Sequence, residues 1–159
     1  MKSHPIWAYE KLEGVETKRF QNSVSLSSLA LFLLTLVIWP VAAFINYRKG
    51  KAQSRLARVA RWLSAGMIVL NVAVVASLFM MIFPSAMGIM VGDVTLDRTV
   101  LTFATIASAL AFISIVFAGL AWKQKYWTLL GRIHYTLVTL AGLAFAWWLN
   151  YWNLIGWKF

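Results

Sequence analysis

Arg132 and His134 are the residues whose chemistry is hardest to explain by packing alone. Both lie in an apolar stretch after Trp127, and an ionisable side chain inside a membrane-spanning stretch is a candidate for function. A proton relay through His134 would need an acidic partner at membrane depth, and none of the apolar stretches contains one. Both residues lie within about 10 Å of a basic gap, at 1.5 Å per helical residue. We therefore expect Arg132 to extend to the interface and His134 to hydrogen-bond as a neutral ring, with an intramembrane enzyme as the alternative.

Combinations of nucleophile and base that would support catalysis are absent from the sequence. The chain has two histidines, His4 and His134, and no cysteine, and it contains no Ser-x-x-Lys, Gly-x-Ser-x-Gly or His-Glu-x-x-His motif. Asp93 and Asp97 have no further ligands nearby, so we interpret them as part of a solvated loop rather than a cation site. We expect no catalytic, cofactor-binding or metal-binding residue, and therefore no enzyme activity, in this chain.

The composition indicates that lipid is the solvent for much of the surface. Of 159 residues, 61% are hydrophobic and 13% are charged, whereas a soluble domain has roughly a quarter of its residues charged. The net charge of +10 would suit a nucleic-acid binder, but the basic residues occupy short gaps between long apolar runs. That distribution is typical of membrane topology, so we do not expect nucleic-acid binding.

Apolar runs long enough to cross a bilayer predict an all-α, integral membrane four-helix bundle. We place an interfacial, extracytoplasmic linker at 1–23 and the transmembrane domain at 24–159. Ser25, Ser27 and Ser28 are suitable caps for the first span, and Pro40 is expected to kink it or end it early. A cleaved signal peptide is the competing interpretation of this first run. The expected spans are 26–44, 62–83, 100–122 and 128–152.

Basic residues gather in two of the gaps and predict the orientation of the chain. Short loops rich in Lys and Arg remain in the cytoplasm, so both termini and the loop with Asp93 and Asp97 are expected outside the cytoplasmic membrane. The spacing of Arg55, Arg58 and Arg61 also suits a helical face that touches anionic lipid. The basic residues are Arg48, Lys49, Lys51, Arg55, Arg58, Arg61, Lys123 and Lys125.

Polar and small residues within the spans predict contacts between helices. The third span is rich in small residues, such as the pairs Ala104/Ser108 and Ala107/Ala111, which allow close approach of neighbouring helices. We expect it to be a central packing helix, although a homodimer face would use the same residues. The candidates for intramembrane polar contacts are Asn71, Arg132, His134, Asn150 and Asn153.

Several stretches of the chain carry a resemblance to a known family. Near the end stand Tyr126-Trp-Thr-Leu-Leu-Gly-Arg-Ile-His-Tyr-Thr-Leu and Phe145-Ala-Trp-Trp-Leu-Asn-Tyr-Trp-Asn-Leu-Ile-Gly. Before the first span stand Tyr9-Glu-Lys-Leu and Glu16-Thr-Lys-Arg-Phe-Gln, and the span itself contains Trp39-Pro40. Together they resemble the carboxy-terminal membrane region of beta-lactamase-related, penicillin-binding-protein-like serine hydrolases.

The resemblance implies a membrane anchor without its enzyme. In that family an extracytoplasmic catalytic domain, with a Ser-x-x-Lys motif, precedes the helices, and this chain lacks that domain. A start at Met1 just ahead of the linker leaves open a truncated reading frame, a split gene or an excised fragment. The expected partners are membrane lipids and a serine hydrolase domain encoded upstream. The alternative is an independent small membrane protein that serves as a complex subunit or a carrier of small molecules.

Overall fold

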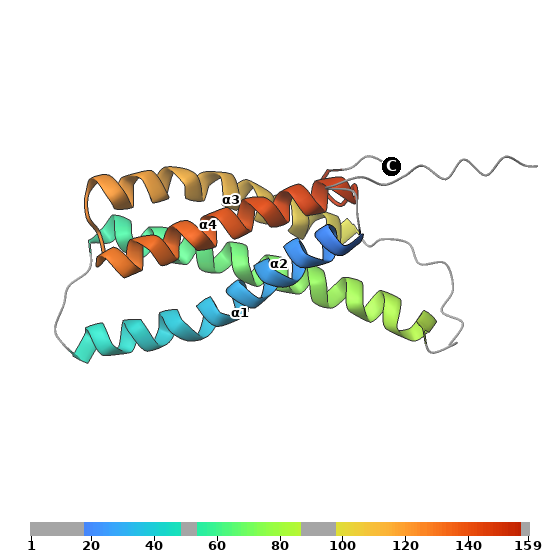
Figure 1. The fold of residues 1–159 in the computed structure, drawn as a ribbon, viewed down its shortest axis with the longest axis horizontal. Helices are drawn as coiled ribbons and strands as arrows, with labels where there is room; N and C mark the ends of the chain where they lie inside the picture. Colours follow the sequence, from blue (N-terminus) through green and yellow to red (C-terminus); the bar gives the residue numbers. More distant parts are fainter. Residues whose placement is uncertain (1–17, 49–53, 87–97, 157–159) are drawn as a thin grey trace, which may run out of the picture.

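Four helices make up the part of the chain that the structure describes. The computed structural model describes residues 18–48, 54–86 and 98–156, with the side chains of 18, 46–47 and 81–86 left out. The helices are α1 (Lys18–Arg48), α2 (Arg55–Ala86), α3 (Arg98–Lys123) and α4 (Leu129–Tyr151), and no strand occurs within these residues (Figure 1). The predicted all-α four-helix bundle is confirmed.

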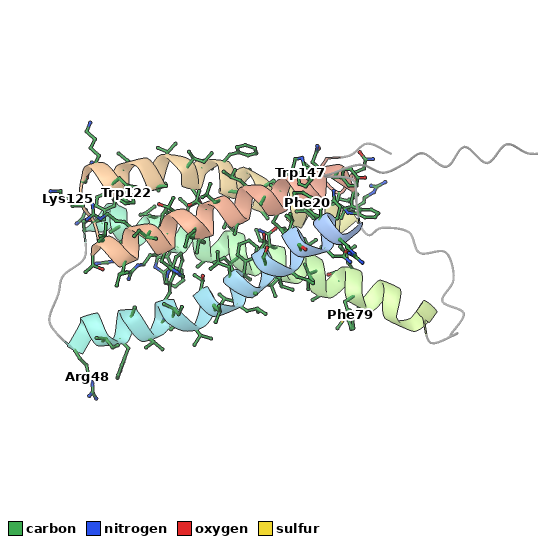
Figure 2. The ribbon with its side chains drawn as sticks, viewed as in Figure 1. Phe20, Arg48, Phe79, Trp122, Lys125 and Trp147 are labelled. Carbon is green, nitrogen blue, oxygen red and sulfur yellow. The ribbon has the colours of Figure 1, made fainter. Side chains whose placement is uncertain are left out.

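The helices pack so that α3 lies between α2 and α4, while α1 packs mainly against α4. Four helix termini lie together at one end of the bundle: the C-termini of α1 and α3 and the N-termini of α2 and α4 (Figure 1). Figure 2 shows Arg48, Trp122 and Lys125 at this end, which we call the basic end, and Phe20 and Trp147 at the opposite end. The Phe20 and Trp147 rings meet edge to face at 6.2 Å, which joins the start of α1 to the end of α4.

Each helix is long and apolar enough to span a bilayer. Large apolar side chains are exposed along all four helices, including Leu34, Met80, Phe112 and Leu140. Such a surface is unfavourable in water and is matched by lipid chains. The chain is therefore a multi-pass membrane protein.

Small residues on α3 allow the helices to approach closely, as the sequence predicts. The buried face of α3 is made largely of alanine and serine, and opposite it lies Gly142 of α4. A Cβ atom at Gly142 would stand 2.6 Å from Met67 Sδ and 3.4 Å from Ala111 Cβ. Because hydrocarbon surrounds the bundle, this close van der Waals contact is a main source of its stability. The buried small residues of α3 are Ala104, Ala107, Ser108, Ala111 and Ser114.

The helices extend beyond the expected spans at several places. The first helix begins at Lys18, so residues 18–23 belong to α1, while the rest of the expected linker lies outside the described residues. It also continues through Pro40 to Arg48, so the prediction of an early end is wrong. A proline is tolerated in a spanning helix because neighbouring groups satisfy the carbonyl that it leaves free.

Serine side chains near the start of α1 do not cap it. Since the helix begins upstream, Ser25 and Ser27 lie inside its first turns and donate to backbone carbonyls of Asn22 and Ser23. By contrast, Ser54 caps α2, because its Oγ accepts a hydrogen bond from the Ala57 N–H at 3.2 Å. The residues that follow, Arg-Leu-Ala-Arg-Val-Ala-Arg, contain good helix formers, so α2 starts well before its apolar run.

Asn71 is buried on α2, and its side-chain Oδ1 has no hydrogen-bond partner among the described residues. An unpaired buried acceptor costs free energy that an apolar side chain of similar volume avoids. We expect Asn71→Val to raise the free energy of unfolding by about 1 kcal/mol, measured by SDS titration in mixed micelles. Asn150→Val is the control, because Asn150 is exposed and should show little change. A loss of stability at Asn71→Val would contradict this prediction.

Candidate functional site

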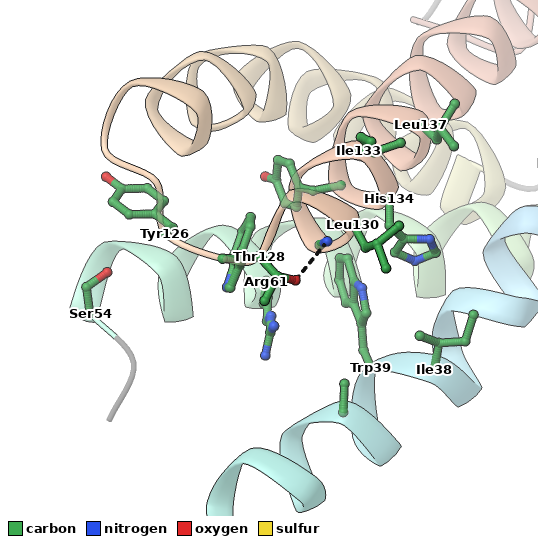
Figure 3. Close-up of a pocket in the computed structure, with 14 residues that line it drawn as sticks. Ile38, Trp39, Ser54, Arg61, Tyr126, Thr128, Leu130, Ile133, His134 and Leu137 are labelled. Atoms are coloured by element: carbon green, nitrogen blue, oxygen red, sulfur yellow. Dashed lines mark hydrogen bonds between the residues drawn. The ribbon is translucent and has the colours of Figure 1, made fainter. Parts of the chain in front are cut away.

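A pocket of about 670 Å³ lies at the basic end, between α1, the start of α2 and the start of α4 (Figure 3). Its polar and aromatic wall is made by Trp39 of α1, Arg61 of α2, Trp127 and His134. Exposed apolar side chains on α1 and α4 form another wall, namely Ile38, Leu130, Ile133 and Leu137. The pocket therefore combines a cation, aromatic rings and an apolar side.

The start of α4 provides the backbone of one wall. Thr128 is the N-cap, and its Oγ1 accepts a hydrogen bond from the Gly131 N–H at 3.3 Å. A Cβ atom at Gly131 would stand 2.9 Å from the Cβ of Trp127, so glycine lets the chain bring Trp127 close to the first helical turn. A helix start also carries a partial positive charge from its free N–H groups, which adds to the charge of Arg61.

Arg61 is half-buried and lines the pocket. Its Cζ atom lies 5.2 Å from the centre of the Trp127 ring, a cation–π distance that fixes the guanidinium against the indole. The Trp127 Nε1 atom is buried and has no hydrogen-bond partner among the described residues. All Asp and Glu residues of the chain fall within 1–17 and 87–97, so no carboxylate of the described residues balances Arg61.

Tyr135 is the buried centre around which the pocket is built. Its ring is nearly parallel to that of Trp39, with centroids 6.3 Å apart, and it lies 5.0 Å from the ring of Trp127. Its hydroxyl accepts a hydrogen bond from Ser64 Oγ at 3.1 Å, and Ser64 lies 3.3 Å from Ser114 Oγ. Tyr135 thus joins α2, α3 and α4 through polar contacts and holds α1 through Trp39.

His134 contacts α1 rather than a second ionisable group. Its Nε2 atom lies 3.2 Å from Thr35 Oγ1, and the Thr35 hydroxyl donates to the Leu31 carbonyl at 2.7 Å. The direction of the hydrogen bond between His134 and Thr35 follows the tautomer of the histidine ring. The ring also meets Trp39 edge to face at 6.2 Å. This hydrogen bond to a neighbouring helix is the kind of contact that the sequence predicts for His134.

Arg132 faces a different helix, so the structure does not bring it together with His134. Its Cζ atom lies 5.1 Å from the centre of the Trp122 ring on α3. The Trp122 indole in turn donates to Thr136 Oγ1 at 3.0 Å. Arg132 therefore packs across the α3–α4 turn at the basic end.

A second hollow, of about 360 Å³, lies between α1 and α2. Trp39 and Arg61 line both hollows, and Thr35 and Arg58 line only the second. The two hollows therefore share Trp39 and Arg61 as wall residues. Arg61 reaches both of them.

The other basic residues lie on the surface. Arg48, Arg55, Arg58, Lys123 and Lys125 are exposed, and Lys49 and Lys51 lie outside the described residues. The guanidinium of Arg48 covers the ring of Phe44 at 5.0 Å. Of the predicted basic face, only Arg61 turns inward. This difference could not be read from spacing alone.

Asn150 and Asn153 lie exposed at the end of α4. Asn153 has φ of 54°, and its N–H donates to the Asn150 carbonyl, while the Leu154 N–H donates to the Leu149 carbonyl at 2.9 Å. Asparagine tolerates this left-handed conformation, which ends helices. In the described structure Asn153 therefore terminates α4.

Trp39, Thr35, Ser64 and Tyr135 contribute to the site but were not singled out as site residues by the sequence. Trp39 appears only within the family resemblance, and serine, threonine and tyrosine within apolar runs carry little information by themselves. The positions of Tyr135, His134 and Thr139 within one helix do not show which residues of other helices they contact. Within the described residues no group of three His, Cys, Asp or Glu side chains is placed to hold a metal ion.

Comparison of the chain with protein-family models, with curated proteins and with solved structures found no match.

Proposed function

We propose that the chain is a non-catalytic membrane domain that anchors a beta-lactamase-related serine hydrolase at the outer face of the cytoplasmic membrane. The observation that carries this proposal is the side on which the chain enters and leaves the bundle. The start of α1 and the end of α4 lie together, at the end opposite the basic end (Figure 1). A domain that precedes α1 would hang from that side.

The charge distribution supports the orientation in this proposal. Exposed basic side chains at the basic end include Arg48, Arg55 and Lys123, which flank short connections. Short basic connections remain in the cytoplasm, so the opposite end faces outward. The family resemblance places its catalytic domain on that same outer side.

The form of the helices favours an anchor over a carrier. Secondary transporters bind their substrates at helices that are broken near the bilayer midplane. Within the described residues all four helices run unbroken through their apolar stretches, even at Pro40. An anchor needs only such continuous helices and a stable bundle.

The absence of cysteine allows a direct test of the orientation. Ser3→Cys and Gln124→Cys each introduce a single thiol, before α1 and at the basic end. In intact cells a membrane-impermeant maleimide should label Ser3→Cys, and it should label Gln124→Cys only after the membrane is opened. The cysteine-free parent chain is the control for background labelling. Labelling of Gln124→Cys in intact cells would refute an outward-facing anchor.

The identity of the anchored domain has a separate test. We expect the DNA immediately upstream to encode, in frame or in an adjacent reading frame, a domain with a Ser-x-x-Lys motif. When that domain is co-expressed with this chain, it should co-purify with the membrane fraction. An unrelated neighbouring gene with its own terminator would count against the hydrolase and leave the orientation result standing.

A further inference from the structure

Arg61 is the one feature of the pocket that the anchoring role does not require. A guanidinium at membrane depth is costly unless it is paired or reaches water or headgroups. Arg61 lies six residues into α2, about 9 Å from the helix start at 1.5 Å per residue. Its cation–π contact with Trp127 uses the flat face of the group and leaves the N–H donors at the edge free. No carboxylate of the described residues occupies them.

The surroundings of Arg61 favour an anion. The start of α4 at Thr128 adds the positive end of a helix dipole, and its first N–H groups have no partner within the helix. The Trp127 Nε1 on the same wall is a buried donor without a partner in the described structure. Arginine pairs well with phosphate because its planar fork can donate two parallel hydrogen bonds.

The apolar side of the pocket indicates that the anion carries a hydrocarbon chain. Ile38 on α1 and Ile133 and Leu137 on α4 line the pocket and are also exposed on the outer surface of the bundle. In a bilayer these side chains face lipid, so the pocket is continuous with the hydrocarbon region. A free phosphate ion would leave this surface uncovered, whereas an acyl chain would cover it.

We propose that this pocket binds an anionic phospholipid, with its phosphate on Arg61 and the start of α4. The acyl chain lies along Ile38, Ile133 and Leu137, between α1 and α4. A zwitterionic lipid is a poorer ligand, because Arg61 repels the cationic group of its headgroup. The described part of the wall has no carboxylate that could pair with that cationic group. The second hollow, which also has Trp39 and Arg61 in its wall, offers room for a second chain of the same lipid.

Quenching by brominated lipid reports this binding through Trp39 and Trp127, which line the pocket. The other seven of the chain's nine tryptophans give a background that is common to the variants compared. The full chain is reconstituted in phosphatidylcholine vesicles that contain a small fraction of phosphatidylglycerol, with bromine on the acyl chains of one lipid at a time. Arg61→Gln should weaken the association of phosphatidylglycerol about tenfold, since a charge-assisted contact is lost. Arg55→Gln removes the same charge from an exposed position of the same helix and should change it less than twofold. Equal effects of the two variants would overturn the site, because they would indicate general surface attraction.

A second pair of variants tests the apolar wall of the pocket. This test remains valid even when the Arg61→Gln variant does not fold. Ile133→Phe adds bulk at the mouth of the pocket without adding a tryptophan to the quenching signal and keeps Arg61, so it should also reduce the selective binding of phosphatidylglycerol. Ile113→Phe is the control, since Ile113 is similarly exposed, on α3, and does not line the pocket. Unchanged selectivity in Ile133→Phe would refute the proposed position of the acyl chain.

A competition with inorganic phosphate separates the lipid from free phosphate. Inorganic phosphate at millimolar concentration should not displace phosphatidylglycerol, because it cannot cover the apolar side. Displacement at that concentration would overturn the assignment to a lipid. Phosphate is supplied on both sides of the vesicle membrane, so the assay does not depend on which way the chain is inserted. Its outcome is therefore independent of the anchor proposal.

Discussion

Replacing Tyr135 with alanine should destabilise the four-helix bundle by about 3 kcal/mol. The Tyr135 side chain is 1% exposed, and it packs between the rings of Trp39 and Trp127. Its loss removes both ring contacts and leaves a cavity at the place where all four helices meet. The free energy of unfolding, measured by SDS titration in mixed micelles with far-ultraviolet circular dichroism, should show the change.

Tyr135→Phe is the matched control, because it keeps the ring and removes only the hydroxyl. Ser64 then loses one acceptor but can donate to Ser114, which lies 3.3 Å away. The expected loss is at most about 1 kcal/mol. If phenylalanine destabilised the bundle as much as alanine, the hydrogen bonds rather than the ring would hold this region together.

Replacing Gly142 with valine should destabilise the bundle by about 3 kcal/mol through overpacking. The first added carbon would already stand 2.6 Å from Met67 Sδ, and Ala111 lies 3.4 Å away on the other side. The unbranched Met67 side chain can move away from one methyl group, so Gly142→Ala should cost less than half as much. Two further methyl groups leave α4 no room and force it away from α2 and α3. The same SDS titration measures the change.

Gly119→Val supplies the control for the change of residue type. Gly119 is also in a helix, on α3, but a Cβ atom there would meet nothing within 4 Å. Its replacement should leave the bundle as stable as the parent or slightly more stable, because glycine is a poor helix former. Similar losses at both positions would show that helix propensity, rather than close packing, decides the result at Gly142.

Much of the architecture could be predicted because it depends on one-dimensional properties of the chain. The length of each apolar run shows that a helix can cross a bilayer, and the small residues of α3 indicate close packing. The helix ends were less predictable. Lys18 and Arg55 begin helices well before the apolar runs, because capping and helix propensity, rather than hydrophobicity, decide where a helix starts.

The basic residues show which part of the candidate site could not be predicted from the sequence. Arg55, Arg58 and Arg61 recur every three residues, so their side chains spread over about 120° of the helix surface at 100° per residue. Spacing alone predicts that all three side chains lie on one exposed face of the helix. In the structure Arg55 and Arg58 are exposed, whereas Arg61 meets Trp127 from a turn more than sixty residues later.

The sequence by itself determined that this is a multi-pass helical protein, because transfer of apolar residues into lipid depends on composition along the chain and hardly on partners. Only the tertiary structure decided which polar residues meet. His134 bonds Thr35, Arg132 packs on Trp122, and Tyr135 joins Ser64 to two tryptophans. The contacts of His134 with Thr35 and of Tyr135 with Ser64 join helices far apart in sequence. The geometry of all these contacts depends on the rotation of each helix about its axis. That rotation is set by packing against the neighbouring helices, so Arg61 becomes a candidate site only when α1, α2 and α4 are together.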